Sequence, residues 1–317
     1  MAVVLLPSSL LPISTLAAAP GATAADGPGA LSHFDLARKD CLGTARNTTS
    51  KVWYTVANGV LSDVYFPTAD NTNVETLQFV VTDGKTFTDL QSRDTTYTVQ
   101  SLDARSLDCR TTSTAKSGRY QIVTDYLTDP SRNTVVMRTK FTPLIGDLAT
   151  YNLYVRYDPS INGNGGGGAG NGGGDTGIVD TSTGHALPVA FDTNTASQAS
   201  NRTYATPVFS ALDASTPFTQ VSNGFAGAAS DGLRQLDGAH SLTATFANAT
   251  NGNLVQTTAV NLSRGGNFTI ALGFGTTQAD ATAAAEGTLS TISTSSRRRT
   301  TTHGTSTTTR WRLRPTM

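Results

Sequence analysis

The sequence has little charge and very little glutamate. Charged residues make up 15% of the 317 positions, and lysine plus arginine equal aspartate plus glutamate at 23 each. A net charge of zero indicates no bulk attraction to nucleic acid or to an anionic membrane. Glu75 and Glu286 are the only glutamates. Acid–base reactions that use paired carboxylates, often with a glutamate of raised pKa, therefore have few candidate residues, although aspartate can serve.

Cysteine and histidine are too few and too scattered to indicate a zinc site. The sequence has two cysteines, Cys41 and Cys109, and four histidines, with no Cys-x-x-Cys spacing. In an exported protein the two cysteines can form a disulfide, and the alternative is two unrelated buried thiols. No cofactor is expected, although Asp-rich turns would allow calcium at a site that the sequence does not locate.

Long apolar runs are also absent. No run after the N-terminus reaches the roughly 18 residues that a membrane span needs. Residues 2–16 form a short apolar leader, followed by Ala22-Thr23-Ala24. This pattern predicts a signal peptide over residues 1–25, cleaved near Ala24 or Ala25, although no basic residue precedes the apolar run. The alternative is a disordered leader. We expect the protein to be extracellular.

The body of the chain has the pattern of many short strands. Residues 51–56 and 60–66 are β-rich and flank Asn58-Gly59, a strong hairpin signal because both residues tolerate positive φ. Similar segments, bounded by Gly, Asn, Asp and Pro, follow at residues 74–82, 95–102, 119–128, 134–141, 150–157, 203–212, 241–247, 254–262 and 267–274. This series predicts an all-β fold, a large antiparallel sandwich over residues 26–275.

Three segments depart from this pattern. Residues 163–174 are almost all Gly and Asn, which predicts a flexible loop inside one sandwich. Residues 276–289 are Ala-rich and predict one short helix that leaves the sandwich. Residues 290–317 consist mainly of Thr, Ser and Arg without periodicity, so we expect a disordered tail. Its abrupt onset suggests a hypothesis of translation in the wrong reading frame.

Several segments, taken in order, resemble a known family. They are residues 50–55 (SKVWYT), 59–67 (GVLSDVYFP), 77–84 (LQFVVTDG), 126–130 (YLTDP), 153–159 (LYVRYDP), 252–257 (GNLVQT) and 270–275 (IALGFG). Each alone is ordinary β sequence. The ordered series, which runs from about residue 43 to residue 287, is similar to the N-terminal domain of bacterial glucodextranases and related family-fifteen glucoamylases.

The resemblance implies a super-β-sandwich of the galactose-mutarotase-like kind. In that family the sandwich packs on a catalytic barrel of paired helices in the same chain, reached through an Ala-rich linker helix. The barrel carries both catalytic glutamates, so no residue here matches them and no catalytic residue is assigned. The implied parent enzyme hydrolyses α-glucan or dextran and releases glucose. We therefore expect a non-catalytic domain, inactive alone, whose partners are the barrel and the polysaccharide, with no nucleic acid or membrane partner.

One loop is a candidate for contact with sugar or with the barrel. Tyr65, Phe66 and Asp70 end a strand and open a loop, and Trp53 and Tyr54 would extend them into an aromatic platform. Alternating aromatic residues in strands are more often part of the core.

Two other functions stay open at this point. One is an autonomous carbohydrate-binding module. The other is a mutarotase-like epimerase, which would need His185 or His240 with a carboxylate as acid and base. A sandwich fold does not by itself imply that activity.

Overall fold

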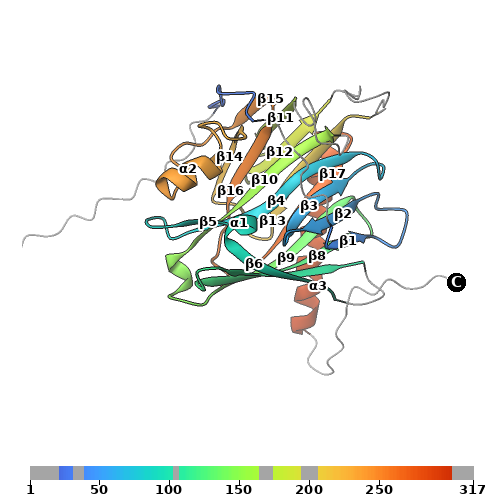
Figure 1. Cartoon of the computed structure of the whole chain (residues 1–317). Coiled ribbons are helices and arrows are strands. Elements are labelled where there is room, and N and C mark those ends of the chain that lie inside the picture. Colours follow the sequence, from blue (N-terminus) through green and yellow to red (C-terminus); the bar gives the residue numbers. More distant parts are fainter. Residues whose placement is uncertain (1–20, 31–38, 103–106, 164–173, 194–205, 302–317) are drawn as a thin grey trace, which may run out of the picture.

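Two antiparallel sheets stack face to face in the computed structural model, which describes residues 21–30, 39–102, 107–163, 174–193 and 206–301 (Figure 1). This confirms the predicted large antiparallel sandwich. The predicted leader lies mostly in residues 1–20, outside the described residues. So do residues 164–173 of the predicted Gly-rich loop.

The first sheet has eight strands. Its order is β1 (Cys41–Thr44), β2 (Trp53–Ala57), β3 (Val60–Tyr65), β4 (Thr72–Thr82), β10 (Asn152–Gly163), β16 (Leu254–Ala259) and β14 (Gln220–Phe225), and β5 (Thr88–Leu90) pairs with β4. The β2–β3 hairpin turns at Asn58 and Gly59, with φ of 53° and 76°. Positive φ at both positions is what a tight two-residue hairpin requires.

The second sheet has nine strands. Its order is β15 (Asn248–Gly252), β11 (Asp175–Asp180), β12 (Leu187–Asp192), β13 (Val208–Ala214), β17 (Asn267–Gly275), β9 (Thr134–Pro143), β8 (Tyr120–Thr128), β7 (Cys109–Ala115) and β6 (Thr95–Ser101). Along β8 the side chains alternate, so that Tyr120, Ile122 and Tyr126 are buried between the sheets. This period of two places one face of each sheet in the core.

One predicted strand is absent. Residues 241–247 form an irregular connection, and β15 begins only at Asn248. The reason is a side chain that competes for the backbone, because Gln235 Oε1 accepts the N–H groups of Thr243 and Ala244, both at 2.9 Å. Those groups are then unavailable to a ladder of backbone hydrogen bonds.

Besides the expected C-terminal helix, α3 (Gln278–Thr301), the described part of the structure has two further α-helices, α1 (Gln91–Asp94) and α2 (Gly232–Ala239). A sequence signal for α2 exists in Asp231, whose carboxylate accepts the Leu233 N–H at 2.9 Å and caps the helix.

The predicted boundary between a helix ending at 289 and a tail starting at 290 is wrong, since α3 continues to Thr301. The helix lies against the outer face of the nine-stranded sheet, where Ala281 and Ala285 are fully buried. Gly273 makes this possible, because a Cβ there would lie 2.5 Å from the Ala281 carbonyl oxygen. Once a helix is anchored, adding residues costs little, and the Thr291 hydroxyl donates to the Gly287 carbonyl. Residues 302–317 of the predicted tail lie outside the described residues.

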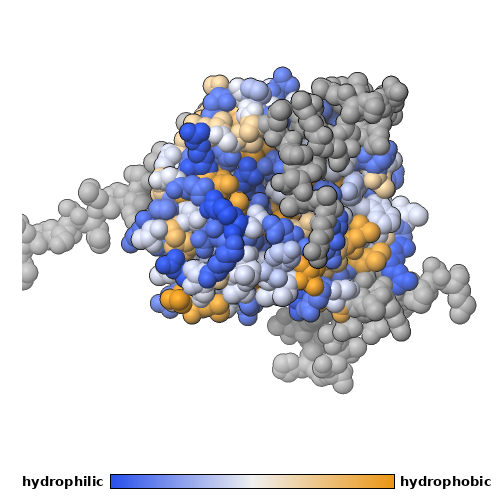
Figure 2. All heavy atoms as spheres, in the orientation of Figure 1, coloured by the Kyte–Doolittle hydropathy of each residue, from blue (hydrophilic) through white to orange (hydrophobic). Residues whose placement is uncertain are grey.

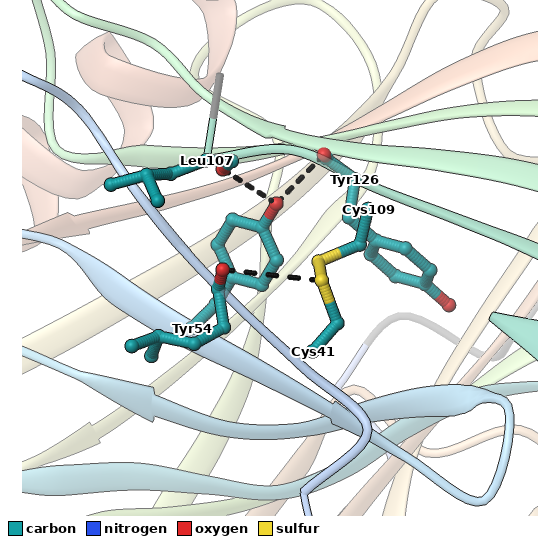
Figure 3. The surroundings of a disulfide bond; sticks show 6 residues. Cys41, Tyr54, Leu107, Cys109 and Tyr126 are labelled. Atoms are coloured by element: carbon teal, nitrogen blue, oxygen red, sulfur yellow. Dashed lines mark hydrogen bonds between the residues drawn. A yellow bond between two sulfur atoms is a disulfide. The ribbon is translucent and has the colours of Figure 1, made fainter. Parts of the chain in front are cut away.

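A disulfide joins the two sheets near one side of the sandwich (Figure 3). It links Cys41 in β1 to Cys109 in β7, with the Cα atoms 6.3 Å apart. Beside it, the buried Tyr54 hydroxyl donates to the Tyr126 carbonyl at 2.7 Å, which is a second bond between the sheets. Gly43 gives the Tyr54 ring its space, because a Cβ there would lie 2.1 Å from Tyr54 Cζ.

Replacing Cys41 and Cys109 with serine should lower the free energy of unfolding by about 4 kcal/mol, because the bridge closes a loop with a sequence separation of 68. Urea unfolding followed by circular dichroism measures this loss. Dithiothreitol should lower the urea midpoint of the wild type and leave that of the double variant unchanged. Equal midpoints for the oxidised wild type and the double variant would contradict the prediction.

Candidate functional site

The residues predicted to form a site lie where β3 passes into β4. The turn between these strands, residues 66–71, is closed by the Phe66 N–H, which donates to the Asn71 carbonyl at 3.0 Å, and by the Asn71 N–H, which donates to the Thr68 carbonyl at 3.2 Å. Asp70 is exposed in this turn. The turn therefore presents its tip to solvent while its two ends are tied together.

Buried asparagines hold this turn from below. Asn73 Nδ2 donates to the carbonyls of Phe66 and Asn71, at 2.8 Å and 2.9 Å. Asn162, at the end of β10, donates its N–H to Asn73 Oδ1 at 3.0 Å and accepts from Asn71 Nδ2 at 2.9 Å. Asn71 and Asn73 are fully buried. Buried polar networks of this kind fix one conformation, so the turn is preorganised.

The structure separates Tyr65 from Phe66. The Phe66 ring enters the core and lies 5.8 Å, centroid to centroid, from the Phe274 ring. Tyr65 is half-buried on the outer face, where its hydroxyl donates to Asp63 Oδ2 at 2.9 Å. Phe66 thus anchors the turn in the core, whereas Tyr65 is partly exposed and Asp70 is exposed.

Trp53 and Tyr54 divide in the same way, because successive side chains of a strand point to opposite faces. Tyr54 is fully buried, and Trp53 is 39% exposed. Trp53 is in register with Tyr65 on β3 and with Thr44 on β1. Cross-strand partners have Cβ atoms about 5 Å apart, so Trp53 and Tyr65 lie side by side on the outer face.

An ionic network lies beside these two rings. Lys39 Nζ is 2.8 Å from Asp63 Oδ2, the atom that also accepts the Tyr65 hydroxyl. The Asp63 side chain is only 9% exposed. Burial and the Asp63 charge raise the pKa of Tyr65, which keeps its hydroxyl protonated as a donor. We call Trp53, Tyr65, Asp63 and Lys39 the Trp53 face.

The outer side of the same sheet also carries a buried ionic cluster. Arg156 in β10 is 2.7 Å from Asp158 Oδ2 and 3.2 Å from Asp231 Oδ2. Asp231 caps α2, and Leu236 of that helix packs on Val80 and Tyr154 of the sheet. Arg156 thus pairs with both buried aspartates and joins α2 to the sheet, so the role of the cluster is structural.

The two mid-chain histidines lie beside different sheets. His185 Nε2 is 2.8 Å from Asp213 Oδ1 in β13 of the nine-stranded sheet. His240 ends α2, on the side of the eight-stranded sheet, with its Nδ1 2.9 Å from Thr88 Oγ1. These histidines therefore do not form one acid–base pair.

A hollow of about 490 Å³ lies between α3 and the β11–β12 turn. It is lined by Asp180, Ser182, Thr183, Gln278, Ala279, Thr282, Ala283 and Glu286. Burial and the charges of Asp213 and Asp180 raise the pKa of Glu286. Asp180 is already engaged, because it accepts the Ser182 N–H at 2.8 Å and the Thr282 hydroxyl at 3.3 Å. Glu75 lies in β4 of the other sheet, so the two glutamates do not face each other.

No group of three or more His, Cys, Asp or Glu side chains within the described ranges is arranged to hold a metal ion. Calcium binding therefore remains a prediction without a site. In the same ranges, no helix is long and apolar enough to cross a membrane.

The fold and the site together define a two-sheet super-sandwich with covering helices and an aromatic surface at one end. The sequence profile of the family described as glucodextranase, domain N, matches residues 24–303. The chain belongs to this family. The match extends past residue 290, where the sequence pattern placed the start of the tail.

Relatives of known activity agree with this assignment. A glucoamylase from Clostridium sp. (strain G0005) is 32% identical over 268 residues, which cover 84% of this chain and 35% of that protein. The crystal structure of a bacterial glucoamylase complexed with acarbose is 32% identical, with a TM-score of 0.76 over 85% of this chain and 37% of that chain. The chain thus spans about a third of the length of the relatives that it matches.

Asp231→Ala should lower the free energy of unfolding by about 3 kcal/mol or more, because it removes a helix cap and leaves buried Arg156 partly unpaired. Asp237→Ala, in the same helix, removes an exposed pair with Arg93 and should cost less than about 1 kcal/mol. Urea titration of both variants measures the difference. Equal losses would contradict the structural role of the cluster.

A buried aspartate at the start of β11 should make stability depend on pH. Burial raises the pKa of Asp175 well above its usual value, and the charges of Asp192 and Asp158 add to this effect, although Asp175 accepts the Ile161 N–H at 3.1 Å. The folded state then holds a proton that the unfolded state releases near pH 4. The stability from this group is therefore present below pH 4 and is lost as the pH rises through the raised pKa.

Asp175→Asn should remove this loss, because an amide can still accept the Ile161 N–H and carries no charge. We expect the variant to be more stable than the wild type at pH 8 by an amount on the order of 1 kcal/mol, and the gain to shrink toward pH 4. Thermal unfolding at several pH values measures this. A variant that is less stable than the wild type at pH 8 would refute the prediction.

Proposed function

We propose that this chain is the non-catalytic sandwich domain of a secreted α-glucan-hydrolysing glucosidase of the glucoamylase type. One observation carries the proposal. The aligned region covers 84% of this chain but only 35% of the Clostridium glucoamylase. Most of that relative, including room for a catalytic barrel, therefore lies outside the region shared with this chain.

The arrangement of acidic residues supports a role without bond cleavage. Glu75 lies in β4 of the eight-stranded sheet, whereas Glu286 lies in α3, which packs on the nine-stranded sheet. Asp158 and Asp231 do come together, but both are buried and both pair with Arg156. Neither arrangement supplies two carboxylates on opposite sides of a glycosidic bond, which hydrolysis requires.

The role that we propose is to pack on a helical barrel of the parent enzyme and to shape the entry of α-glucan or dextran. The preorganised turn at residues 66–71 supports this role, since its exposed tip carries Asp70 and its two ends are fixed by buried asparagines. A rigid projecting turn loses little conformational entropy when a partner binds to it.

Secretion is part of the proposal. The apolar leader supports export, and so does the disulfide, since such bridges persist in oxidising compartments. Thr23 and Ala24 fall inside the predicted signal peptide of residues 1–25. Because Thr23 forms a parallel bridge with Asn248 and the Ala24 N–H donates to the Asn248 carbonyl at 2.8 Å, this pairing argues against cleavage at Ala24 or Ala25.

A second candidate function is a carbohydrate-binding module. The exposed Trp53 beside Tyr65 favours this function over the epimerase hypothesis. His185 and His240 lie beside different sheets and so do not form one acid–base pair.

The chain alone should release no glucose from maltoheptaose, starch or dextran. A hybrid in which residues 24–301 replace the matching region of the Clostridium glucoamylase should hydrolyse starch. In that hybrid, Asp70→Ala should raise KM at least twofold, whereas Asp237→Ala, a distant exposed aspartate, should not. A coupled glucose assay measures glucose release by the chain alone, starch hydrolysis by the hybrid and the KM of the hybrid variants. Glucose release by the chain alone would overturn the non-catalytic assignment.

A further inference from the structure

We propose that the Trp53 face binds an α-glucan chain directly, with one glucosyl ring stacked on Trp53 and Tyr65 and its hydroxyl groups bonded to Asp63 and Lys39. The choice of sugar rests on the proposed function. The geometry rests on four side chains that β2, β3 and the segment before β1 bring together.

The Trp53 face is a part of the sheet surface that the described helices leave open. On the same sheet, α2 covers Val80 and Tyr154 through Leu236. On the nine-stranded sheet, α3 covers the outer face with Ala281, in contact with Ala211. Trp53, by contrast, is 39% exposed. Figure 2 shows hydrophobic residues gathered on the surface around the positions of β1 and β2 in Figure 1.

The chemistry of the Trp53 face suits a sugar. One face of a glucosyl ring is a patch of C–H groups, which packs on the flat surface of an aromatic ring, and the ring edge carries hydroxyl groups. The Trp53 face offers a large exposed indole with a phenol beside it. Next to them lie a carboxylate that accepts hydrogen bonds and an ammonium that donates them.

The Trp53 face is held in place before any ligand arrives. The Tyr65 hydroxyl donates to Asp63, and the same oxygen atom pairs with Lys39. The Lys39 ammonium also lies 3.5 Å from Ser62 Oγ, and Ser62 Oγ is 2.7 Å from Thr55 Oγ1. Fixing these side chains in advance lowers the entropy that binding would otherwise cost.

Charge and area favour a neutral sugar over a protein partner. Lys39 balances Asp63, so the pair attracts neither an acidic nor a basic protein surface. Among the described residues of β1 to β3, the large exposed apolar side chains are Trp53 and Leu42. A stable protein interface buries about 800 Å² per partner around an apolar centre, which is more than two such side chains provide.

The test uses the full chain and maltoheptaose. Isothermal titration calorimetry should show saturable binding. In a Trp311→Phe background Trp53 is the only tryptophan, so its fluorescence should change over the same concentration range. Trp53→Ala should weaken binding roughly tenfold or more, as expected for a central aromatic contact. The affinity of Trp53→Phe should lie between those of Trp53→Ala and the wild type. Tyr65→Phe should weaken binding a few-fold, because it removes the hydrogen bond that holds the Asp63 carboxylate in place.

Tyr97→Ala is the matched control. Tyr97 is 38% exposed, nearly the same as Trp53, but it belongs to β6 and packs on Gly59 at the opposite end of β2. This variant should bind maltoheptaose like the wild type, and all variants should show the wild-type circular dichroism spectrum. Cellohexaose, which is β-linked, should bind at least tenfold more weakly than maltoheptaose.

Three results would overturn the proposal. They are no saturable binding by the wild type, equal losses in Trp53→Ala and Tyr97→Ala, and equal affinity for cellohexaose. A Trp53→Ala variant that changes the oligomeric state, in a chain that binds no glucan, would identify the Trp53 face as a protein contact instead. None of these results alters the hybrid-enzyme test, so failure of the sugar site is distinguishable from failure of the proposed function.

Discussion

The alternation of side chains along paired strands is the constraint on which the rest of this structure depends. It sends Tyr54 and Phe66 inward and Trp53 and Tyr65 outward. The inward pair helps to fix the two sheets together, through the bond from Tyr54 to the Tyr126 carbonyl and the contact of Phe66 with Phe274. The outward pair forms the aromatic surface. The two-residue alternation along the strands therefore places neighbouring residues in the core and in the candidate site.

The sheets themselves limit where function can lie. Their inner faces are filled by the core, and α2 and α3 occupy much of the two outer faces. The Trp53 face and the hollow beside α3 are two exposed places in the described part of the chain. Neither place brings together the two glutamates of the sequence.

Local signals made most of the fold predictable. Asn58-Gly59 is sufficient to predict the β2–β3 hairpin, because few residue pairs tolerate two positive φ angles. Sequence reasoning failed where a distant side chain decides the backbone, as when Gln235 binds the N–H groups at residues 243 and 244. It predicted the first part of α3 but not the extension of this helix to Thr301, because Thr and Ser have low helix propensity.

The candidate site was predictable only in part. The alternation of side chains along a strand could have separated Tyr65 from Phe66. The salt bridge from Lys39 to Asp63 and the hydrogen bond from Asn162 to Asn73, however, depend on strand register and on turns.

The most direct test of a domain that recognises sugar without cleaving it is one NMR titration of the full chain with maltoheptaose. We predict that the Trp53 indole resonance shifts while the sugar anomeric signals stay unchanged in number. New glucose signals, or an indole resonance that does not move, would contradict it.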